Sequence, residues 1–526
     1  MSRAVWRYGG MAVAMAVLLT ALPPYRLTAQ DAERGRMVYD KWCAGCHGDT
    51  GKGDGEAAAY MLPRPRDFTV ALYQIRTTAS GELPRDEDLR RVIDEGMPGS
   101  TMPAWRGRLS AGERDDVIAY LKTLSRFFED DAPEPVEWGS DPGVSEEDLA
   151  EGRRLYRDET ECLKCHGEGG RGDGSSAPTL TDDWDFPVFA ADLTENWNFN
   201  GGGTVEDIYR RMRVGLDGTP MPSYTDAIDA GVITDEQLWL VAHYVRSLSP
   251  QHSPKVRDVI RAPRRTSPLP SGPLDTAWAQ VEPGYIPLVG QIIRGPRQFV
   301  PAVDGVWVQA VHDGERLALR LAWDDRTESP DPEWDEHYDL LRSTVTDVDG
   351  PLPETQGPDR TVIQWPLELT DDVAMPYFLG GDAQRPVSQI VWSNAPPGLS
   401  VGTATGLGSY GARDAGWIGH DAHFADGQWQ LQVDRPLTSP DPSVAPSLPV
   451  GMPVPIAFRV ADGSQGEGEF RVAVSAWYAI YLDVPTPTRV YVQPIVAGLL
   501  TAGLGLFLVL RAQRRANIPD LDAEIS

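Results

Sequence analysis

Two copies of one pentapeptide pattern constrain this chain more than any other feature. Residues 43–47 read Cys-Ala-Gly-Cys-His and residues 162–166 read Cys-Leu-Lys-Cys-His. This spacing lets two thiols bond to the vinyl groups of one haem while the adjacent imidazole reaches the iron, as in c-type haem attachment. The two copies contain all four cysteines of the chain, so no thiol remains for a disulfide, a zinc site or a nucleophile. The sequence therefore predicts two covalently bound haem c groups, attached at Cys43 and Cys46 and at Cys162 and Cys165, with His47 and His166 as iron ligands.

The surroundings of the two pentapeptides repeat as well. Each follows a glycine and a tyrosine that are four residues apart, and each precedes a glycine-rich loop and a short polar segment. The matched parts are Gly35 and Gly152, Tyr39 and Tyr156, 51–55 and 169–174, and 65–69 and 191–194. The cysteines recur after about 119 residues, which indicates an internal duplication. We expect a helix over 31–41, with the glycine, the tyrosine and the first cysteine on one face.

Each copy also leads to a Met-Pro loop. Met102-Pro103 and Met221-Pro222 share the pattern Met-Pro-x-aromatic, whereas Met97 lacks it, so Met102 is favoured over Met97. Met212, the other candidate in the second copy, is expected to lie on a helix and to pack in the core. The two loops resemble the Met-Pro loop of class I cytochromes c, in which the thioether opposes the histidine. The resemblance implies Met102 and Met221 as the second axial ligands.

A closing helix is predicted after each methionine loop. Residues 110–113 and 234–237 have the pattern of capping boxes, and the apolar spacing that follows predicts helices that pack on the opening helices. His243 lies in the second of these helices and is expected to be structural or at the surface.

An iron with His on one face and Met on the other has no open position for a substrate, and the thioether raises its potential. We therefore expect electron transfer rather than catalysis. A haem enzyme such as a dihaem peroxidase or reductase is the alternative, and it requires a vacant iron position.

The charge and the two ends of the chain indicate where it works. The formal net charge of −29 argues against a nucleic-acid partner. Arg3 and Arg7, an apolar run and a small-residue site predict a signal peptide over 1–29, with an uncleaved N-terminal anchor as the alternative. Residues 490–510 carry no charge and are long enough to cross a bilayer, and arginines follow at once. The positive-inside rule then puts the tail, 511–526, in the cytoplasm and the bulk in the periplasm, held by a single-pass helix in the inner membrane.

The region before this helix has a different pattern. Residues 251–274 are rich in Pro, Ser and Arg and predict a linker. Residues 275–483 show short alternating strands, with a hairpin signal over 306–323 around Asp313-Gly314 and no helical spacing. This pattern predicts a β-sandwich.

A succession of ordered motifs in this region resembles a known family. They are Trp323-Asp324-Asp325, 376–381, Arg385-Pro386-Val387 with 390–392, 426–429 and 475–478. Together they are similar to the γ subunit of ethylbenzene dehydrogenase and of related type II enzymes of the dimethyl sulfoxide reductase family. The resemblance implies a sandwich that holds a haem b between a methionine and a lysine and relays electrons from a molybdenum and iron-sulfur enzyme.

This sequence departs from that family at the ligands. Leu379 stands where the family has its methionine, no lysine follows Lys255, and Arg471, near the place of the lysine, stays charged. The residues that could substitute are Met375 and Met452 on one side and His312, His337, His420 and His423 on the other. The expected role of the sandwich is therefore docking or scaffolding, with a haem b or a carbohydrate-type ligand site as alternatives.

The prediction is a multidomain chain in which two small all-α domains precede an all-β domain and one membrane helix. Its parts are a signal peptide over 1–29, cytochrome c domains over 30–130 and 131–250, a linker over 251–274, a sandwich over 275–483, a transmembrane helix over 490–510 and a tail over 511–526. The expected function is electron transfer between a partner oxidoreductase, of the molybdenum kind by resemblance, and the respiratory chain.

Overall fold

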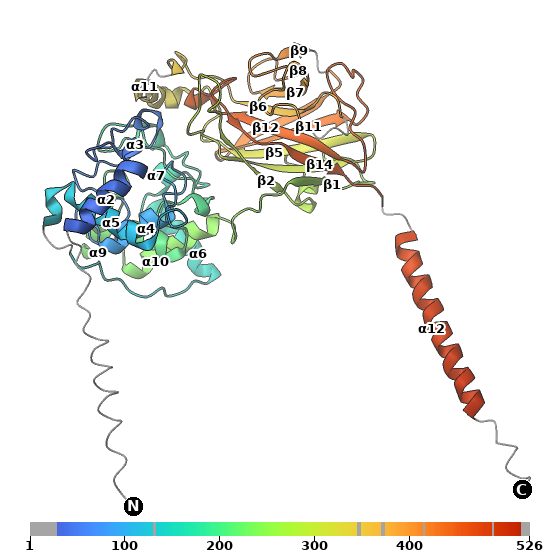
Figure 1. Cartoon of the computed structure of the whole chain (residues 1–526), viewed down its shortest axis with the longest axis horizontal. Helices are drawn as coiled ribbons and strands as arrows, with labels where there is room; N and C mark the ends of the chain where they lie inside the picture. Colours follow the sequence, from blue (N-terminus) through green and yellow to red (C-terminus); the bar gives the residue numbers. More distant parts are fainter. Residues whose placement is uncertain are drawn as a thin grey trace, which may run out of the picture.

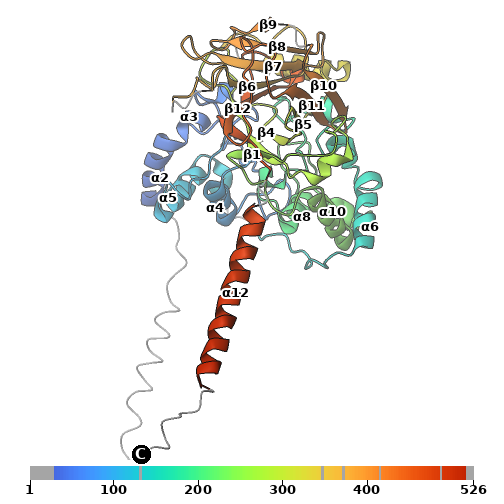
Figure 2. The ribbon, with the colours of Figure 1, turned by 90° about the vertical axis from the view of Figure 1, so that its right-hand side faces the viewer.

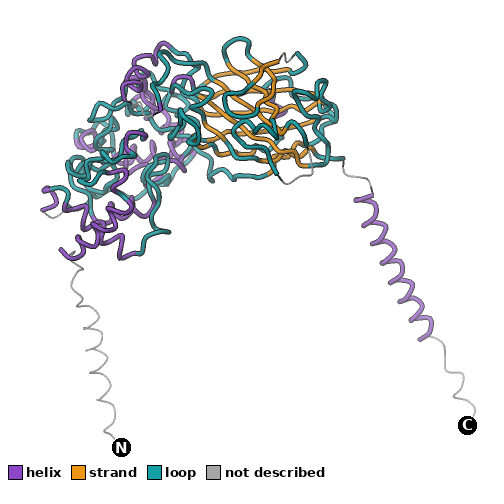
Figure 3. The backbone as a smooth tube through the Cα atoms, turned by 45° about the horizontal axis from the view of Figure 1, so that its top comes forward, coloured by secondary structure: helices purple, strands orange, loops and turns teal. Residues whose placement is uncertain are grey.

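The computed structural model describes residues 29–129, 133–344, 349–369, 374–413, 416–485 and 489–516. The predicted signal peptide up to residue 28, and the tail beyond residue 516, lie outside the described residues. Two helical units stand against a β-rich domain, and a long helix extends away from the body (Figure 1). We call residues 29–129 unit 1, residues 133–250 unit 2 and residues 251–485 the β domain. Helices and strands occupy separate parts of the molecule (Figure 3).

Unit 1 is built on a close crossing of its first and last helices. A Cβ added at Gly35 would lie 1.9 Å from the Asp116 carbonyl oxygen, so only glycine permits this approach. Tyr39 and Tyr120 then pack with ring centroids 5.1 Å apart. The predicted capping box of the last helix is present at Ser110. The helices of unit 1 are α2 (Ala29–Trp42), α3 (Ala44–His47), α4 (Asp86–Glu95) and α5 (Ala111–Thr123).

Unit 2 repeats this crossing. A Cβ at Gly152 would lie 2.3 Å from the Leu240 carbonyl oxygen, and Tyr156 packs on Tyr244 at 5.3 Å. The predicted capping box at Thr234 is also present. Its helices are α6 (Glu146–Asp158), α7 (Leu163–His166), α8 (Val205–Val214), α9 (Thr225–Asp229) and α10 (Asp235–Leu248). The two units lie side by side, α2, α4 and α5 next to α6, α8 and α10 (Figure 2).

The β domain contains two sheets. One has the strand order β10-β11-β5-β4-β2, and the other has the order β1-β14-β12-β6-β7-β8-β9, with β13 paired to β12 and to β3. The strands are β1 (Val259–Ala262), β2 (Gly284–Pro287), β3 (Val289–Gly290), β4 (Gly305–His312), β5 (Arg316–Asp324), β6 (Arg360–Pro366), β7 (Val387–Ser393), β8 (Leu399–Ala404), β9 (Gly411–Arg413), β10 (Gly419–Ala425), β11 (Gln428–Pro436), β12 (Pro453–Ala461), β13 (Ala473–Val474) and β14 (Tyr478–Leu482).

One hydrophobic core joins the two sheets. It includes Leu319 and Trp323 of β5 in the first sheet and Ile363 and Trp365 of β6 in the second, all at most 1% exposed. The predicted hairpin is present as the antiparallel pair β4–β5. Most positions of β4, β5 and β6 are buried, so the two sheets close over a shared interior.

Two segments of this domain differ from the sequence-based expectation. The stretch predicted as a linker, 251–274, contains β1, which pairs in parallel with β14 near the other end of the domain. Pairing between residues more than two hundred positions apart leaves no local signal. A helix, α11 (Asp335–Thr344), interrupts a region read as strands and turns, with His337, Tyr338 and Leu341 on its buried face.

The last element is α12 (Arg489–Ala516), which includes the predicted span. Within the described residues it is the one helix long and apolar enough to cross a membrane, over Val490–Arg514, with a mean hydropathy of 2.1 and none of that span buried. The described body of the molecule therefore does not bury this apolar helix.

Candidate functional site

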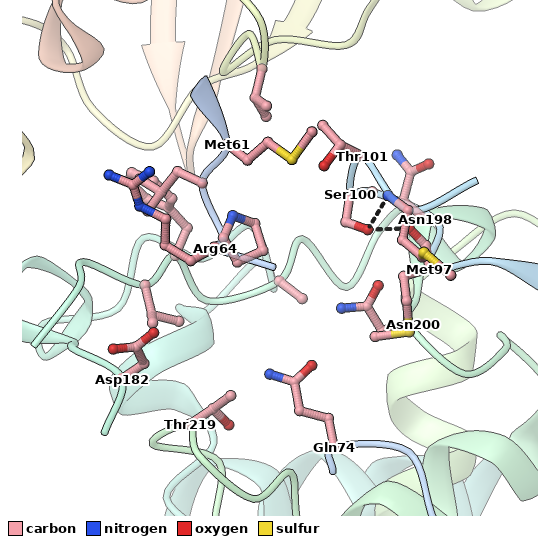
Figure 4. Close-up of a pocket in the computed structure, with 18 of the residues that line it drawn as sticks. Met61, Arg64, Gln74, Met97, Ser100, Thr101, Asp182, Asn198, Asn200 and Thr219 are labelled. Atoms are coloured by element: carbon pink, nitrogen blue, oxygen red, sulfur yellow. Dashed lines mark hydrogen bonds between the residues drawn. The ribbon is translucent and has the colours of Figure 1, made fainter. Parts of the chain in front are cut away.

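A cavity of about 1470 Å³ lies between the two units and reaches the β domain. All eight residues predicted to hold haem line it, four from each unit: Cys43, Cys46, His47 and Met102, and Cys162, Cys165, His166 and Met221. Met97, Ser100 and Thr101 of unit 1 lie beside Asn198 and Asn200 of unit 2, and Thr219 of unit 2 lies apart from them, near Gln74 (Figure 4). The tertiary structure therefore brings the two sites, far apart in sequence, into one space.

The two histidines are held in the same orientation. His47 Nδ1 lies 3.0 Å from the Arg66 carbonyl oxygen, and His166 Nδ1 lies 2.9 Å from the Ala191 carbonyl oxygen. A carbonyl only accepts, so in each ring Nδ1 carries the proton and Nε2 keeps its lone pair for a metal. Burial lowers the pKa of both imidazoles, which favours the neutral form that binds iron.

The segments that supply these carbonyls are the loosely matched polar segments of the repeat. Asp67 accepts hydrogen bonds from the backbone N–H and hydroxyl of Thr69, and Asp192 does the same for Thr194. These turns fix the peptide that precedes each aspartate. The sequence showed that the two polar segments resemble each other, but only the structure shows that they orient the ligand histidines.

Both methionine loops fold back on the end of a helix. α4 ends at Gly96 and α8 at Gly215, with φ values of 71° and 72°. A Cβ at Gly96 would lie 2.7 Å from the Met102 carbonyl oxygen, and one at Gly215 would lie 2.7 Å from the Ser223 nitrogen. Both the positive φ and the close approach require glycine here.

The loops also decide which methionines correspond. The Met97 N–H donates to the Met102 carbonyl, and the Leu216 N–H donates to the Met221 carbonyl at nearly the same distance, 3.0 and 3.1 Å. Met102 is therefore equivalent to Met221, and Met97 is equivalent to Leu216, a residue that cannot ligate iron. Met212 is 3% exposed on α8 and belongs to the core of unit 2.

The chemistry of the lining fits two haem c groups. Each half of the cavity offers two thiols, an imidazole with a free Nε2 and a thioether, among mainly apolar side chains. Burial raises the pKa of the Cys43 thiol to about 12 and also raises that of Cys162, so neither behaves as a reactive thiolate. These cysteines suit covalent attachment rather than nucleophilic catalysis.

A glycine after each pentapeptide keeps the attachment site compact. A Cβ at Gly55 would lie 2.5 Å from the Gly45 carbonyl oxygen, and one at Gly174 would lie 2.3 Å from the Lys164 carbonyl oxygen. We expect Gly55→Ala to destabilise unit 1 by about 1–3 kcal/mol, because the clash is with backbone that cannot move aside. The midpoint of chemical denaturation measures this.

Gly112→Ala is the control for this substitution. Gly112 lies in the first turn of α5, where an added Cβ meets nothing within 4 Å. Alanine should be neutral or stabilising there, by up to ~1 kcal/mol. Equal midpoints for the two variants would contradict the packing described for Gly55.

Arginine side chains of unit 1 form hydrogen bonds and ion pairs with residues of unit 2. The Arg76 side chain, 1% exposed, donates to the Val214 carbonyl at 2.6 Å and to Asp217 at 2.7 Å. Arg91 donates to Asp207 at 2.7 Å in a second contact between the units. No sequence motif indicated Arg76, because its partners in unit 2 lie about 140 residues further along the chain.

The positions considered for a haem b do not form a site. Leu379 packs on Ala461, Val472 and Val474, and the Arg471 guanidinium donates to backbone carbonyls. The large cavity is lined by none of the substitutes proposed from sequence. Among them, His312 and His337 are buried, Met452 is 50% exposed and His420 and His423 lie on the exposed strand β10.

Comparison with known families agrees with the geometry of the cavity. Residues 30–121 match the family described as cytochrome c oxidase, cbb3-type, subunit III, and residues 149–249 match the family cytochrome c. The chain contains two cytochrome c domains. Cytochrome c domains imply covalently bound haem c, and two domains are consistent with two haems.

Its relatives are subunits of respiratory complexes. A Haloferax mediterranei protein named as a respiratory nitrate reductase heme subunit is 26% identical over 251 residues, 47% of this cytochrome and 82% of the relative. A cbb3-type cytochrome c oxidase subunit of Rhodobacter capsulatus is 27% identical over 220 residues, 41% of this cytochrome and 61% of the relative. A solved chain from a reducing HAO-like protein complex of Kuenenia stuttgartiensis is 42% identical, with 43% of this cytochrome and 99% of that chain covered and a TM-score of 0.40.

Proposed function

We propose that this cytochrome is a membrane-anchored dihaem protein that transfers electrons between a partner oxidoreductase and the respiratory chain. One observation carries the proposal. Each thiol pair faces an imidazole with a free Nε2 and a thioether, and both sets line the same cavity. When bound, each haem c supplies a one-electron redox centre.

The residues of the chain have separate parts in this function. Cys43, Cys46, Cys162 and Cys165 would attach the two haems. His47 and His166 would bind iron through Nε2, and Met102 and Met221 would supply the second ligands. The Arg66 and Ala191 carbonyls fix the imidazole tautomer. The thioethers favour the reduced state and raise the potential.

The apolar lining keeps water away from the irons. In unit 1 it includes Phe68, which stacks on the His47 ring with centroids 4.4 Å apart, and Leu89, Ile93 and Trp105, which are at most 8% exposed. A dry site costs little reorganisation when the charge on the iron changes. Because the two sites open into one cavity, haems bound there would lie in the same space, which would allow electron transfer between them within this chain.

The anchor orients the molecule in the inner membrane. α12 crosses as a single span, and Arg511 and Arg514, at its end, stay on the cytoplasmic side. The haem domains and the β domain then lie in the periplasm, where the predicted signal peptide delivers them.

The β domain is proposed as a docking and scaffold module related to the ethylbenzene dehydrogenase γ subunit. Leu379 packs in an apolar cluster and the Arg471 guanidinium donates to backbone carbonyls, so neither position supplies a haem b ligand. The partner is proposed to be an oxidoreductase of the molybdenum and iron-sulfur class, which the family resemblance supports. The Haloferax relative's printed name, a nitrate reductase heme subunit, supports an oxidoreductase partner.

A haem count tests the proposal directly. We expect a pyridine haemochrome assay on the purified full chain to give two c-type haems and no b-type haem per polypeptide. The reduced protein at neutral pH should not bind carbon monoxide, because both iron faces are closed. A b-type haem would restore the full γ-subunit role, and carbon monoxide binding at both irons would favour a haem enzyme.

A further inference from the structure

Three carboxylates lie buried together where the β domain faces unit 2. Asp325 follows β5, Asp359 precedes β6 and Asp462 follows β12, and they are 4%, 0% and 1% exposed. One carboxylate oxygen of each lies within 4.8 Å of those of the other two. Three strand ends from both sheets thus converge on one point.

The backbone around the cluster is arranged to hold ionised carboxylates. Asp359 accepts from the N–H groups of Ser329 and Gly463 at 2.8 and 3.0 Å, and from the Trp429 indole at 3.0 Å. Asp462 accepts from the N–H and hydroxyl of Ser464 at 2.8 and 2.6 Å. Hydrogen bonds of this kind favour the charged form of a carboxylate.

Two oxygens beside this cluster have no partner. Asp325 accepts one hydrogen bond, from the Thr327 N–H at 3.2 Å, and its Oδ2 is buried without any. The Asn394 Oδ1 is also buried and unpartnered, while its amide nitrogen donates to the Ser329 carbonyl and its backbone N–H donates to the Asp359 carbonyl. A buried acceptor left unsatisfied is costly, so a ligand that bound to the Asp325 oxygen would be stabilised.

No side chain neutralises the cluster. Among the described residues, no ion pair joins any of the three aspartates to an arginine or a lysine. The Arg326 charge acts on Asp325 and Asp462 without forming an ion pair, and its guanidinium lies over the Phe189 ring, 4.9 Å from the centroid. Glu467, 4% exposed, adds a fourth acid. Burial and mutual repulsion raise the pKa of Asp359 to about 7.

We propose that Asp325, Asp359 and Asp462 form a site for a divalent cation of the calcium class. Hard oxygen donors, several of them anionic, are the ligands that Ca²⁺ prefers, and it accepts irregular cages of six to eight oxygens. The Asp325 Oδ2, buried without a partner, is a free anionic donor in this cluster. Asp325 and Asp462 also line the large cavity, which gives the ion a path of entry.

The cation would fasten the β domain to unit 2. The segment 324–329 carries the Asp325 ligand and also the contacts to the haem domain. Asp324 pairs with Arg171 at 2.7 Å, and a Cβ at Gly172 would lie 3.2 Å from the Arg326 Nε. Ion binding at Asp325 therefore holds the loop that touches the glycine-rich segment after the second haem pentapeptide.

The test uses the haem-loaded full chain, stripped with EDTA and then dialysed against Ca²⁺. We expect one calcium per chain by elemental analysis and a rise in the thermal midpoint that depends on calcium concentration. Asp325→Asn should weaken calcium binding by about 10–100-fold or more. Asp313→Asn, in the β4–β5 turn far from the cluster, should bind calcium as the unchanged protein does.

The same variants separate a cation from protons. If protons alone neutralise the cluster, the stripped protein should bind no stoichiometric calcium, and neither calcium nor magnesium should change its thermal midpoint, which would overturn the proposal. Asp325→Asn removes one repelling charge, so it should fold and be at least as stable as the stripped parent while losing the calcium response. Haem content and potentials are measured separately, so failure here leaves the electron-transfer proposal standing.

Discussion

Replacing Met102 with leucine should open one iron face in each chain. The reduced variant is expected to bind carbon monoxide at one of its two haems. The oxidised variant is expected to lose about half of the charge-transfer absorption between sulfur and ferric iron. Its midpoint potential should fall at that haem by on the order of 0.1–0.3 V, within the ~0.8 V over which axial ligands set haem potentials. The reason is that leucine fills the loop but has no lone pair to stabilise ferrous iron.

Met97→Leu is the matched control for this prediction. Met97 lies five residues earlier in the same loop, lines the same cavity and is equivalent to Leu216 of unit 2. It should keep the parent's absorption, potential and resistance to carbon monoxide. If Met97→Leu changes the spectrum and Met102→Leu does not, the ligand of unit 1 is Met97. Met221→Leu tests unit 2 in the same way.

Removing the Arg76 side chain should have the largest effect on stability. Its guanidinium makes four hydrogen bonds, to the carbonyls of Tyr73, Ala79 and Val214 and to Asp217. Arg76→Ala leaves Asp217 with only the Ser80 hydroxyl and the Gly81 N–H, and it leaves the Val214 carbonyl without this donor. Breaking a buried pair in this way costs about 3–5 kcal/mol.

Chemical denaturation followed by haem absorbance measures this loss. Arg36→Ala is the control, because the Arg36 side chain is 60% exposed and its pair with Asp40 on α2 is a surface contact worth under ~1 kcal/mol. Arg76→Lys should recover only part of the loss, since an ammonium cannot reach four acceptors that are arranged around a planar guanidinium. A midpoint for Arg76→Ala equal to that of Arg36→Ala would show that the two units do not depend on this contact.

Local chemistry is where the sequence was most informative. Haem attachment needs two thiols and an imidazole at a fixed short spacing, so the pentapeptides can be read directly from the residue order. Capping boxes and the β4–β5 hairpin are equally local, and both are present. Because the sequence is duplicated, an assignment made in one copy could be checked against the matching residue of the other copy.

Long-range pairing is where sequence reasoning stopped. The segment 251–274 was interpreted as a linker because its composition is that of a linker, yet β1 within it gains its strand geometry from β14. The sequence analysis did not predict α11 because this helix has few apolar residues. Its buried face is covered by other parts of the fold, which a local sequence pattern cannot indicate. The family resemblance was based on motifs that are individually loose but occur in the same order. Leu379 packs in an apolar cluster, so the structure does not support the haem b ligand pair of that family.

The sequence by itself determined the candidate ligands of both haems, the duplication and the apolar helix near the C-terminus, because each depends on residues that are neighbours in the chain. Only the tertiary structure decided that the two sites share one cavity, that backbone carbonyls set both histidine tautomers, and that three distant aspartates meet at one point. Those properties depend on distances between residues far apart in sequence, and such distances are set by packing rather than by residue order.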